Sequence, residues 1–135
     1  MTKIIMAEGS LIVAVKSADR FMKLDDGWIK DSLLGIDWGP SSTETMKWEA
    51  AKKYCADLGG RLPERFELLA LVDDTKRDPA TFPIFTDTKT DDWYWTGTIV
   101  AGSDGHAWFV NFYGGSVGSY CKGDGGYVRP VCSSQ

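Results

Sequence analysis

Residues 45–74 constrain the fold most strongly, because they predict two short helices joined by a tight Gly-Gly-Arg-Leu-Pro corner. The first helix carries apolar residues at spacings of three and four, which share one helical face: Trp48, Ala51, Cys55 and Leu58. Thr45 is expected to be its N-cap. Gly59 or Gly60 is expected to end it in the left-handed conformation. The pattern predicts an amphipathic helix with one buried face.

The second helix is expected to follow Pro63, whose fixed φ suits a helix start. Its apolar positions are Phe66, Leu68, Leu69, Ala70, Leu71 and Val72. So many apolar positions predict a well-buried helix. Glu64 stands where Ser or Thr would make a better cap, so we expect a weakly capped start.

Length and charge limit the possible classes of protein. The chain of 135 residues fits a single domain over residues 1–135. A formal net charge of −4 argues against sequence-independent binding to nucleic acid, which depends on clustered Lys and Arg. No apolar run is long enough for a membrane span, and Glu8 and Gly9 interrupt the N-terminal apolar pieces, unlike a signal peptide. We expect a soluble domain with no visible export signal.

Strands and turns are predicted on both sides of the helices. Residues 3–15 allow one or two strands, and residues 21–24 run into an Asp-Asp-Gly turn that favours a hairpin. In the connection 75–90, three apolar residues are expected to form a small satellite cluster: Phe82, Ile84 and Phe85.

The C-terminal half contains strand candidates separated by Gly-rich turns, at residues 92–98, 107–112, 116–120 and 127–131. In the second of these, the two-residue period places alternate side chains on one face, which we assign to the core: Trp108, Val110 and Phe112.

Several motifs follow one another in the order found in one family. They are the helical segment W-E-A-A-K-K-Y-C-A-D-L-G-G-R-L-P, the aromatic strand D-W-Y-W-T-G-T, the strand A-W-F-V-N-F and the ending Y-V-R-P-V. Over residues 31–131 the chain resembles bacterial and phage domains typified by the C-terminal domain of a Legionella collagen-like adhesin (Lcl). The resemblance implies an α+β, C-type lectin-like fold with two helices packed on small, twisted, mostly antiparallel sheets. It leaves residues 1–30 unexplained, as extra strands or as an arm that binds a partner.

Three widely spaced cysteines argue against a disulfide scaffold and against a zinc finger. The resemblance implies that Cys55 and Cys132 lie together and could form a disulfide between the first helix and the final strand. The alternative is that both are small buried apolar residues. Cys121 is predicted to be a free thiol.

The sequence gives little support to the hypothesis of a catalytic site or of a metal-binding site. His106 is the only histidine, and Ser103 and Asp104 lie near it, but no nucleophile-elbow pattern surrounds any serine. A zinc site built from Cys55, Cys121, Cys132 and His106 would lack paired Cys-x-x-Cys spacing. The acidic turns fail the spacing of an EF-hand, so calcium is possible but unsupported. We expect no catalytic residues, no metal and no cofactor.

Polar and aromatic residues in the C-terminal half predict a recognition surface, because tyrosine offers rigid contact area and small polar groups offer hydrogen bonds. Aromatic faces also stack on sugars. The predicted ligand-binding residues are Tyr94, His106, Phe109, Asn111, Tyr113, Ser116, Ser119, Tyr120 and Asp124. The alternative is that these are ordinary exposed residues of a strand-rich domain.

We therefore expect a non-enzymatic recognition or adhesion module that binds a surface glycan or protein receptor. Its setting would be a phage tail or a bacterial cell surface, with residues 1–30 attaching it to the virion or surface scaffold. One alternative is a structural virion component that binds no ligand. A remote alternative is an oxidase resembling the formylglycine-generating enzymes, which would need Cys121 and Cys132 as a copper-binding pair.

Overall fold

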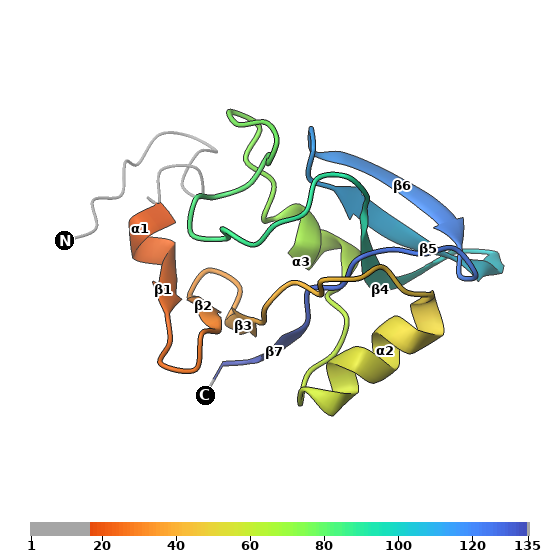
Figure 1. Cartoon of the computed structure of the whole chain (residues 1–135), viewed down its shortest axis with the longest axis horizontal. Helices are drawn as coiled ribbons and strands as arrows, with labels where there is room; N and C mark the ends of the chain where they lie inside the picture. The colour runs from red at the N-terminus through yellow and green to blue at the C-terminus, as the bar shows by residue number, and fades with distance from the viewer. Residues whose placement is uncertain (1–16, 135) are drawn as a thin grey trace.

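Two small antiparallel sheets and the helices beside them make up the fold (Figure 1). The structure, a computed structural model, describes residues 17–134. The first sheet has the order β1-β2-β3-β7, with strands Phe21–Lys23, Ile29–Asp31, Ile36–Trp38 and Val131–Ser133. The second has the order β4-β5-β6, with strands Tyr94–Val100, Ser103–Asn111 and Ser116–Cys121. The helices are α1 (Ser17–Arg20), α2 (Trp48–Asp57) and α3 (Arg65–Leu69). The α+β class is confirmed.

The N-terminal hairpin forms where the sequence predicts it. β1 and β2 pair antiparallel with Phe21 opposite Asp31, and Gly27 adopts a φ of +90° in the turn between them. The strands predicted within residues 3–15 lie outside the described residues. The final strand begins at Val131, later than the predicted 127–131, in keeping with the missing N–H of Pro130.

Helix α2 begins three residues after the predicted cap. Met46 pairs with Gly126 in an isolated antiparallel bridge, and its N–H donates to the Gly126 carbonyl at 2.9 Å. This pairing keeps the backbone extended through Lys47, so the prediction of Thr45 as the N-cap is wrong. The predicted end is confirmed, because Gly59 has a φ of +81°. The buried stripe is also confirmed except for Leu58, which lies beyond the helix and is 44% exposed.

Helix α3 buries a different face from the one predicted. Leu68 and Leu71 are almost fully buried, whereas Phe66 is 66% exposed. Glu67 also turns inward, where its carboxylate accepts two hydrogen bonds from Arg61 at 2.8 and 3.0 Å. The same carboxylate accepts the Glu64 N–H at 2.7 Å, so the expectation of a weakly capped start is wrong.

We expect Glu67→Gln to lower the free energy of unfolding at pH 7 by about 1 kcal/mol, since Arg61 is half exposed and water screens the pair. Burial raises the pKa of Glu67, but the hydrogen bonds from Arg61 and from the Glu64 N–H lower it by more, and the result lies below 4.5. This stabilisation is present above pH 4.5 and is lost as the pH falls through the lower folded pKa. Urea denaturation from acidic to neutral pH should give a shallower pH dependence for the variant. Equal slopes for both proteins would contradict this.

The second sheet separates two apolar cores, since consecutive residues of β4 point to opposite faces. Tyr94, Val110 and Phe112 face the larger core, which α3 and the first sheet complete. Trp95 and Ala107 face the smaller core, against α2. Val110 and Phe112 are buried as predicted, but Trp108 is only half buried, with the Arg65 guanidinium 4.3 Å from its ring. Phe85 belongs to the larger core, so a separate satellite cluster does not form.

A buried ion pair fixes the first sheet. The Arg20 guanidinium donates to both carboxylate oxygens of Asp31 at 2.8 Å, and the Trp38 indole N–H donates to the same carboxylate at 3.0 Å. Asp31 is fully buried and Arg20 is 7% exposed. The carboxylate therefore connects the end of α1 with β2 and β3.

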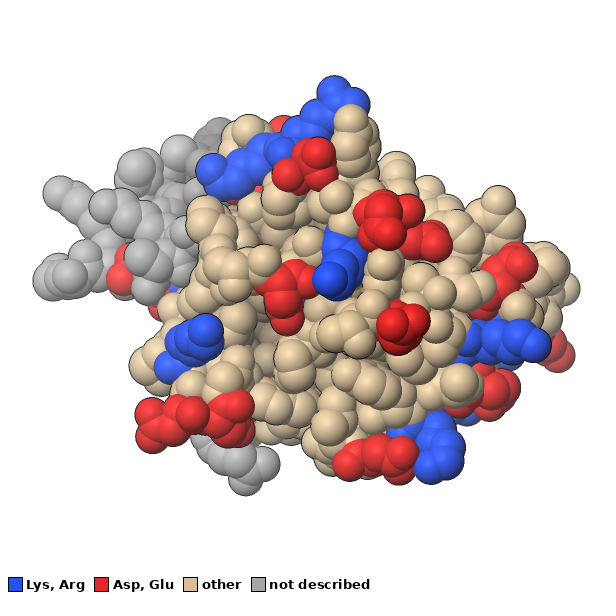
Figure 2. All heavy atoms as spheres, viewed as in Figure 1, with Lys and Arg blue, Asp and Glu red and all other residues tan. Residues whose placement is uncertain are grey.

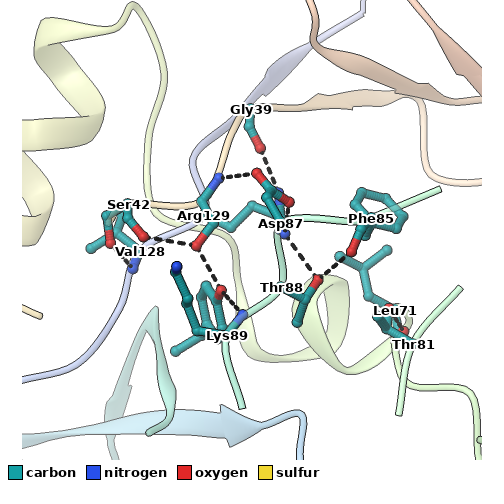
Figure 3. A network of polar contacts seen from close by, with 12 residues as sticks. Gly39, Ser42, Leu71, Thr81, Phe85, Asp87, Thr88, Lys89, Val128 and Arg129 are labelled. Atoms are coloured by element: carbon teal, nitrogen blue, oxygen red, sulfur yellow. Dashed lines mark hydrogen bonds and ion pairs between the residues drawn. The ribbon is translucent and has the colours of Figure 1, made fainter. Parts of the chain in front are cut away.

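A second buried arginine joins three distant segments (Figure 3). Arg129 donates to the Gly39 carbonyl at 2.9 Å, to the Asp87 carboxylate at 2.7 Å and to the Thr88 hydroxyl at 3.1 Å. Only 2% of Arg129 is exposed. The C-terminal Tyr-Val-Arg-Pro-Val motif thus holds the loop before β4 against the segment after β3.

Charges of both signs are interspersed over the face shown in Figure 2, without a continuous basic area there. Among residues 17–134, no helix combines the length and the apolar character that a bilayer span requires.

Candidate ligand-binding surface on the second sheet

The hairpin of β5 and β6 divides the predicted ligand-binding residues between two faces. Its register pairs His106 with Cys121, Ala107 with Tyr120 and Asn111 with Ser116. Because side chains alternate along a strand, one face carries Phe109, Asn111, Ser116 and Tyr120, and the other carries His106 and Ser119. The nine predicted residues therefore do not form one surface.

Three stacked rings dominate the first of these faces: Trp93, Phe109 and Tyr120, here called the aromatic triad. The Trp93 and Tyr120 rings are 4.6 Å apart and nearly parallel, at 8°. Trp93 also stacks on Phe109 at 4.9 Å, and its edge contacts Trp95 at 6.3 Å. Since α2 packs on Trp95 and Ala107, the triad continues the same face beyond the helix.

Two glycines make room for these rings. The Phe109 ring lies over Gly118, where a Cβ atom would be 2.7 Å from the ring. A Cβ atom at Gly126 would be 2.8 Å from the indole nitrogen of Trp93. Within residues 17–134 that indole nitrogen is buried without a hydrogen-bond partner. Tyr120 remains 46% exposed, so the triad offers an aromatic surface to solvent.

Tyr94 was predicted to bind ligand, and this is wrong because its side chain is fully buried. Its hydroxyl lies 2.6 Å from the Ser41 hydroxyl and accepts the Lys89 N–H at 2.8 Å. Burial, the main influence, raises its pKa above the ordinary value. The outward residue is its neighbour Trp93, which the sequence reasoning missed. The signal for Trp93 was its two-residue spacing from Trp95, which pairs with Phe109.

The remaining predicted residues lie at the ends of this hairpin. The Asn111 side-chain oxygen accepts the Tyr113 N–H at 2.9 Å, which shapes the turn after β5. Tyr113 is 44% exposed and lies 4.7 Å from the Arg77 guanidinium. Ser116 is exposed at the start of β6, and Asp124 is half buried in the turn that follows β6.

On the opposite face of the hairpin, three reactive side chains lie next to one another: Ser103, His106 and Cys121. The Ser103 hydroxyl lies 2.7 Å from Nδ1 of His106, and the Cys121 sulfur lies 3.4 Å from Nε2 of the same ring. Ser103 and Asp104 were considered beside His106 in the sequence, whereas Cys121 was considered with His106 only as part of a zinc site. Ser119 is exposed on the same face.

The model of the Lcl C-terminal domain matches residues 27–132. The chain belongs to this family. The resemblance found in residues 31–131 is thereby confirmed, and membership points to a surface or adhesin-like module. No curated protein and no solved structure matches the chain, so the C-type lectin-like fold stays a prediction.

All three cysteines of this Lcl C-terminal domain are free thiols in the structure, so no disulfide joins Cys55 to Cys132. Burial raises the pKa of Cys55 to about 12. Burial also raises the pKa of Cys132, and the Asp37 and Asp26 carboxylates raise it further. Cys121 and Cys132 lie in different sheets, on β6 and β7. Among residues 17–134, no group of three or more His, Cys, Asp or Glu side chains is placed to hold a metal ion.

A cleft of about 470 Å³ lies between α2, the corner that follows it and β4. Its lining includes Trp48, Arg61, Leu62 and Ile99. None of the predicted ligand-binding residues and no member of the triad lines this cleft. The triad is therefore an open surface, separate from the cleft.

Proposed function

We propose that this domain is a non-enzymatic recognition module that binds a surface glycan through the aromatic triad. The observation that carries the proposal is the parallel stacking of Trp93 and Tyr120 on a face of the sheet that α2 leaves uncovered. Family membership, which points to a surface or adhesin-like module, supports it.

The chemistry of the triad suits a saccharide. An aromatic face is electron-rich and apolar, so it favours the C–H groups on one face of a sugar ring. The Tyr120 hydroxyl adds a polar group at the edge of the rings, and the exposed Ser116 adds another on the same strand. Small polar groups around rigid aromatic rings are typical of recognition surfaces.

The triad is also preorganised. Each ring contacts the other two, and Phe109 and Tyr120 are 5.7 Å apart. Rings held in this way lose little side-chain freedom on binding, and this ordering otherwise costs about 0.5 to 1.5 kcal/mol per side chain.

We place the domain in a phage tail or on a bacterial surface. Residues 21–30 belong to the first sheet and its hairpin turn, so we propose residues 1–16 as the attachment to the larger assembly. A receptor protein is the alternative ligand, since exposed aromatic residues are also enriched in protein interfaces. A purely structural role predicts no ligand for the triad.

Binding of the wild-type chain to a panel of immobilised bacterial glycans and intact bacteria tests the proposal. We expect selective retention that soluble glycan competes away. We expect the same result with a chelator, because the triad contains no carboxylate that could hold calcium. Retention by cells that protease treatment abolishes would favour a protein receptor. No retention on any member of the panel would favour the structural role.

A further inference from the structure

A thiol, an imidazole and a hydroxyl lie in line on the face of the hairpin opposite the aromatic triad. Cys121 and His106 are directly opposed in the antiparallel register of β5 and β6. Directly opposed residues project to the same side of a sheet, with Cβ atoms about 4.5 to 5.5 Å apart. The sulfur therefore lies 3.4 Å from Nε2 of His106.

Ser103 contacts the other nitrogen of the same imidazole ring. Its hydroxyl lies 2.7 Å from Nδ1 of His106. When Nδ1 carries the proton and donates it to this hydroxyl, Nε2 presents its lone pair to the Cys121 thiol. A nucleophile beside a base that a third group orients is the arrangement that activates side chains for covalent chemistry.

The other two cysteines lack these features. Cys55 is fully buried, and burial raises its pKa to about 12. Cys132 is partly buried, and its pKa is raised by burial and by nearby carboxylates. Since the thiolate is the reactive form of cysteine, both are poor nucleophiles near neutral pH. Cys121 is exposed and has a base within reach.

We propose that Cys121 is a thiol–disulfide exchange site that takes up a low-molecular-weight disulfide. His106 accepts the thiol proton at Nε2, and the thiolate attacks one sulfur of the disulfide. The new Cys121 S–S bond forms as the bond within the disulfide breaks. The departing thiolate takes the proton from His106. Cys121 is oxidised, and one half of the disulfide is reduced to a thiol.

The test uses oxidised glutathione as the disulfide and intact-mass spectrometry of the folded full chain at pH 7. We expect one adduct, mapped to Cys121, and no fast adduct in Cys121→Ser. Without the base, His106→Ala should react about tenfold more slowly. In Ser103→Ala the base remains but is less well oriented, so the rate should fall less, about threefold.

Three outcomes would overturn the proposal. They are an adduct on Cys132, equal rates of adduct formation in the wild type, His106→Ala and Ser103→Ala, or a covalent dimer of the chain in place of the adduct. A variant that unfolds would expose Cys55 and give more than one adduct. If His106→Ala unfolds, the rate of adduct formation in Ser103→Ala tests the proposal instead. That substitution removes only a hydroxyl from a half-buried residue, so the fold should be retained.

Discussion

Replacing Asp31 with alanine is expected to lower the free energy of unfolding by about 3 to 5 kcal/mol. The change removes the carboxylate that accepts both hydrogen bonds from Arg20 and the bond from Trp38. Arg20 is only 7% exposed, so its guanidinium would remain as a nearly buried cation without its partner. The cost of that unpaired charge exceeds the cost of the lost hydrogen bonds.

Urea denaturation at pH 7 measures the effect, with Asp37→Ala as the matched control. Asp37 lies in the adjacent strand β3 and is also buried. Within residues 17–134 it has no arginine partner, and it accepts a hydrogen bond from Ser134 at 2.6 Å. Its loss should cost about 1 kcal/mol. Similar losses for the two variants would show that the Arg20 pair adds nothing beyond a single hydrogen bond.

Arg129→Met should cost about 2 to 4 kcal/mol, the second largest effect. Arg129 is 2% exposed and joins Gly39, Asp87 and Thr88. The Asp87 side chain is 45% exposed, so water can reach the abandoned carboxylate and the loss is smaller than at Asp31. Arg129→Lys retains the charge but not the planar fork, and should recover only part of the loss. Full recovery by lysine would contradict this account.

The Arg129 variant should also change the response to acid. Burial raises the pKa of Asp87, but the Arg129 charge and hydrogen bond, with backbone donors, lower it by more, to below 3.8. The Arg129–Asp87 pair therefore stabilises the fold above pH 3.8. Its contribution to the free energy of unfolding is lost as the pH falls through the folded pKa of Asp87. Arg129→Met should lose less stability than the wild type over that range. A variant that is as acid-sensitive as the wild type would contradict the expectation.

Local sequence signals predicted the fold where local forces determine it. The apolar stripe of α2, its end at Gly59 and the hairpin of β1 and β2 depend on neighbours within a few residues. The prediction of Thr45 as the cap was wrong because the helix start depends on the pairing of Met46 with Gly126, eighty residues away. The buried face of α3 was also predicted wrongly, although its cause is a local contact: Arg61 donates to Glu67, six residues later, and holds that carboxylate inward.

The candidate site could be predicted only in part for the same reason. Phe109 was predicted to face outward from strand alternation, and Tyr120 was predicted from its residue type. To place Trp93 rather than Tyr94 on the outward face required the pairing of Tyr94 with Val110 and of Trp95 with Phe109, which strand alternation alone does not give. The contact of His106 with Cys121 depends on the register of a hairpin and not on sequence spacing.

The most direct test of the aromatic triad as the recognition surface compares two tyrosines of nearly equal exposure. Tyr120 is 46% exposed within the triad, and Tyr113 is 44% exposed at the turn beside Arg77. Both alanine variants, checked for folding by circular dichroism, would be measured for binding to the bacterial glycans that retain the wild type. We expect binding by Tyr120→Ala to be about tenfold weaker, which corresponds to a loss of about 1.4 kcal/mol, and binding by Tyr113→Ala to be unchanged. Unchanged binding by Tyr120→Ala, or a selective loss in Tyr113→Ala, would contradict it.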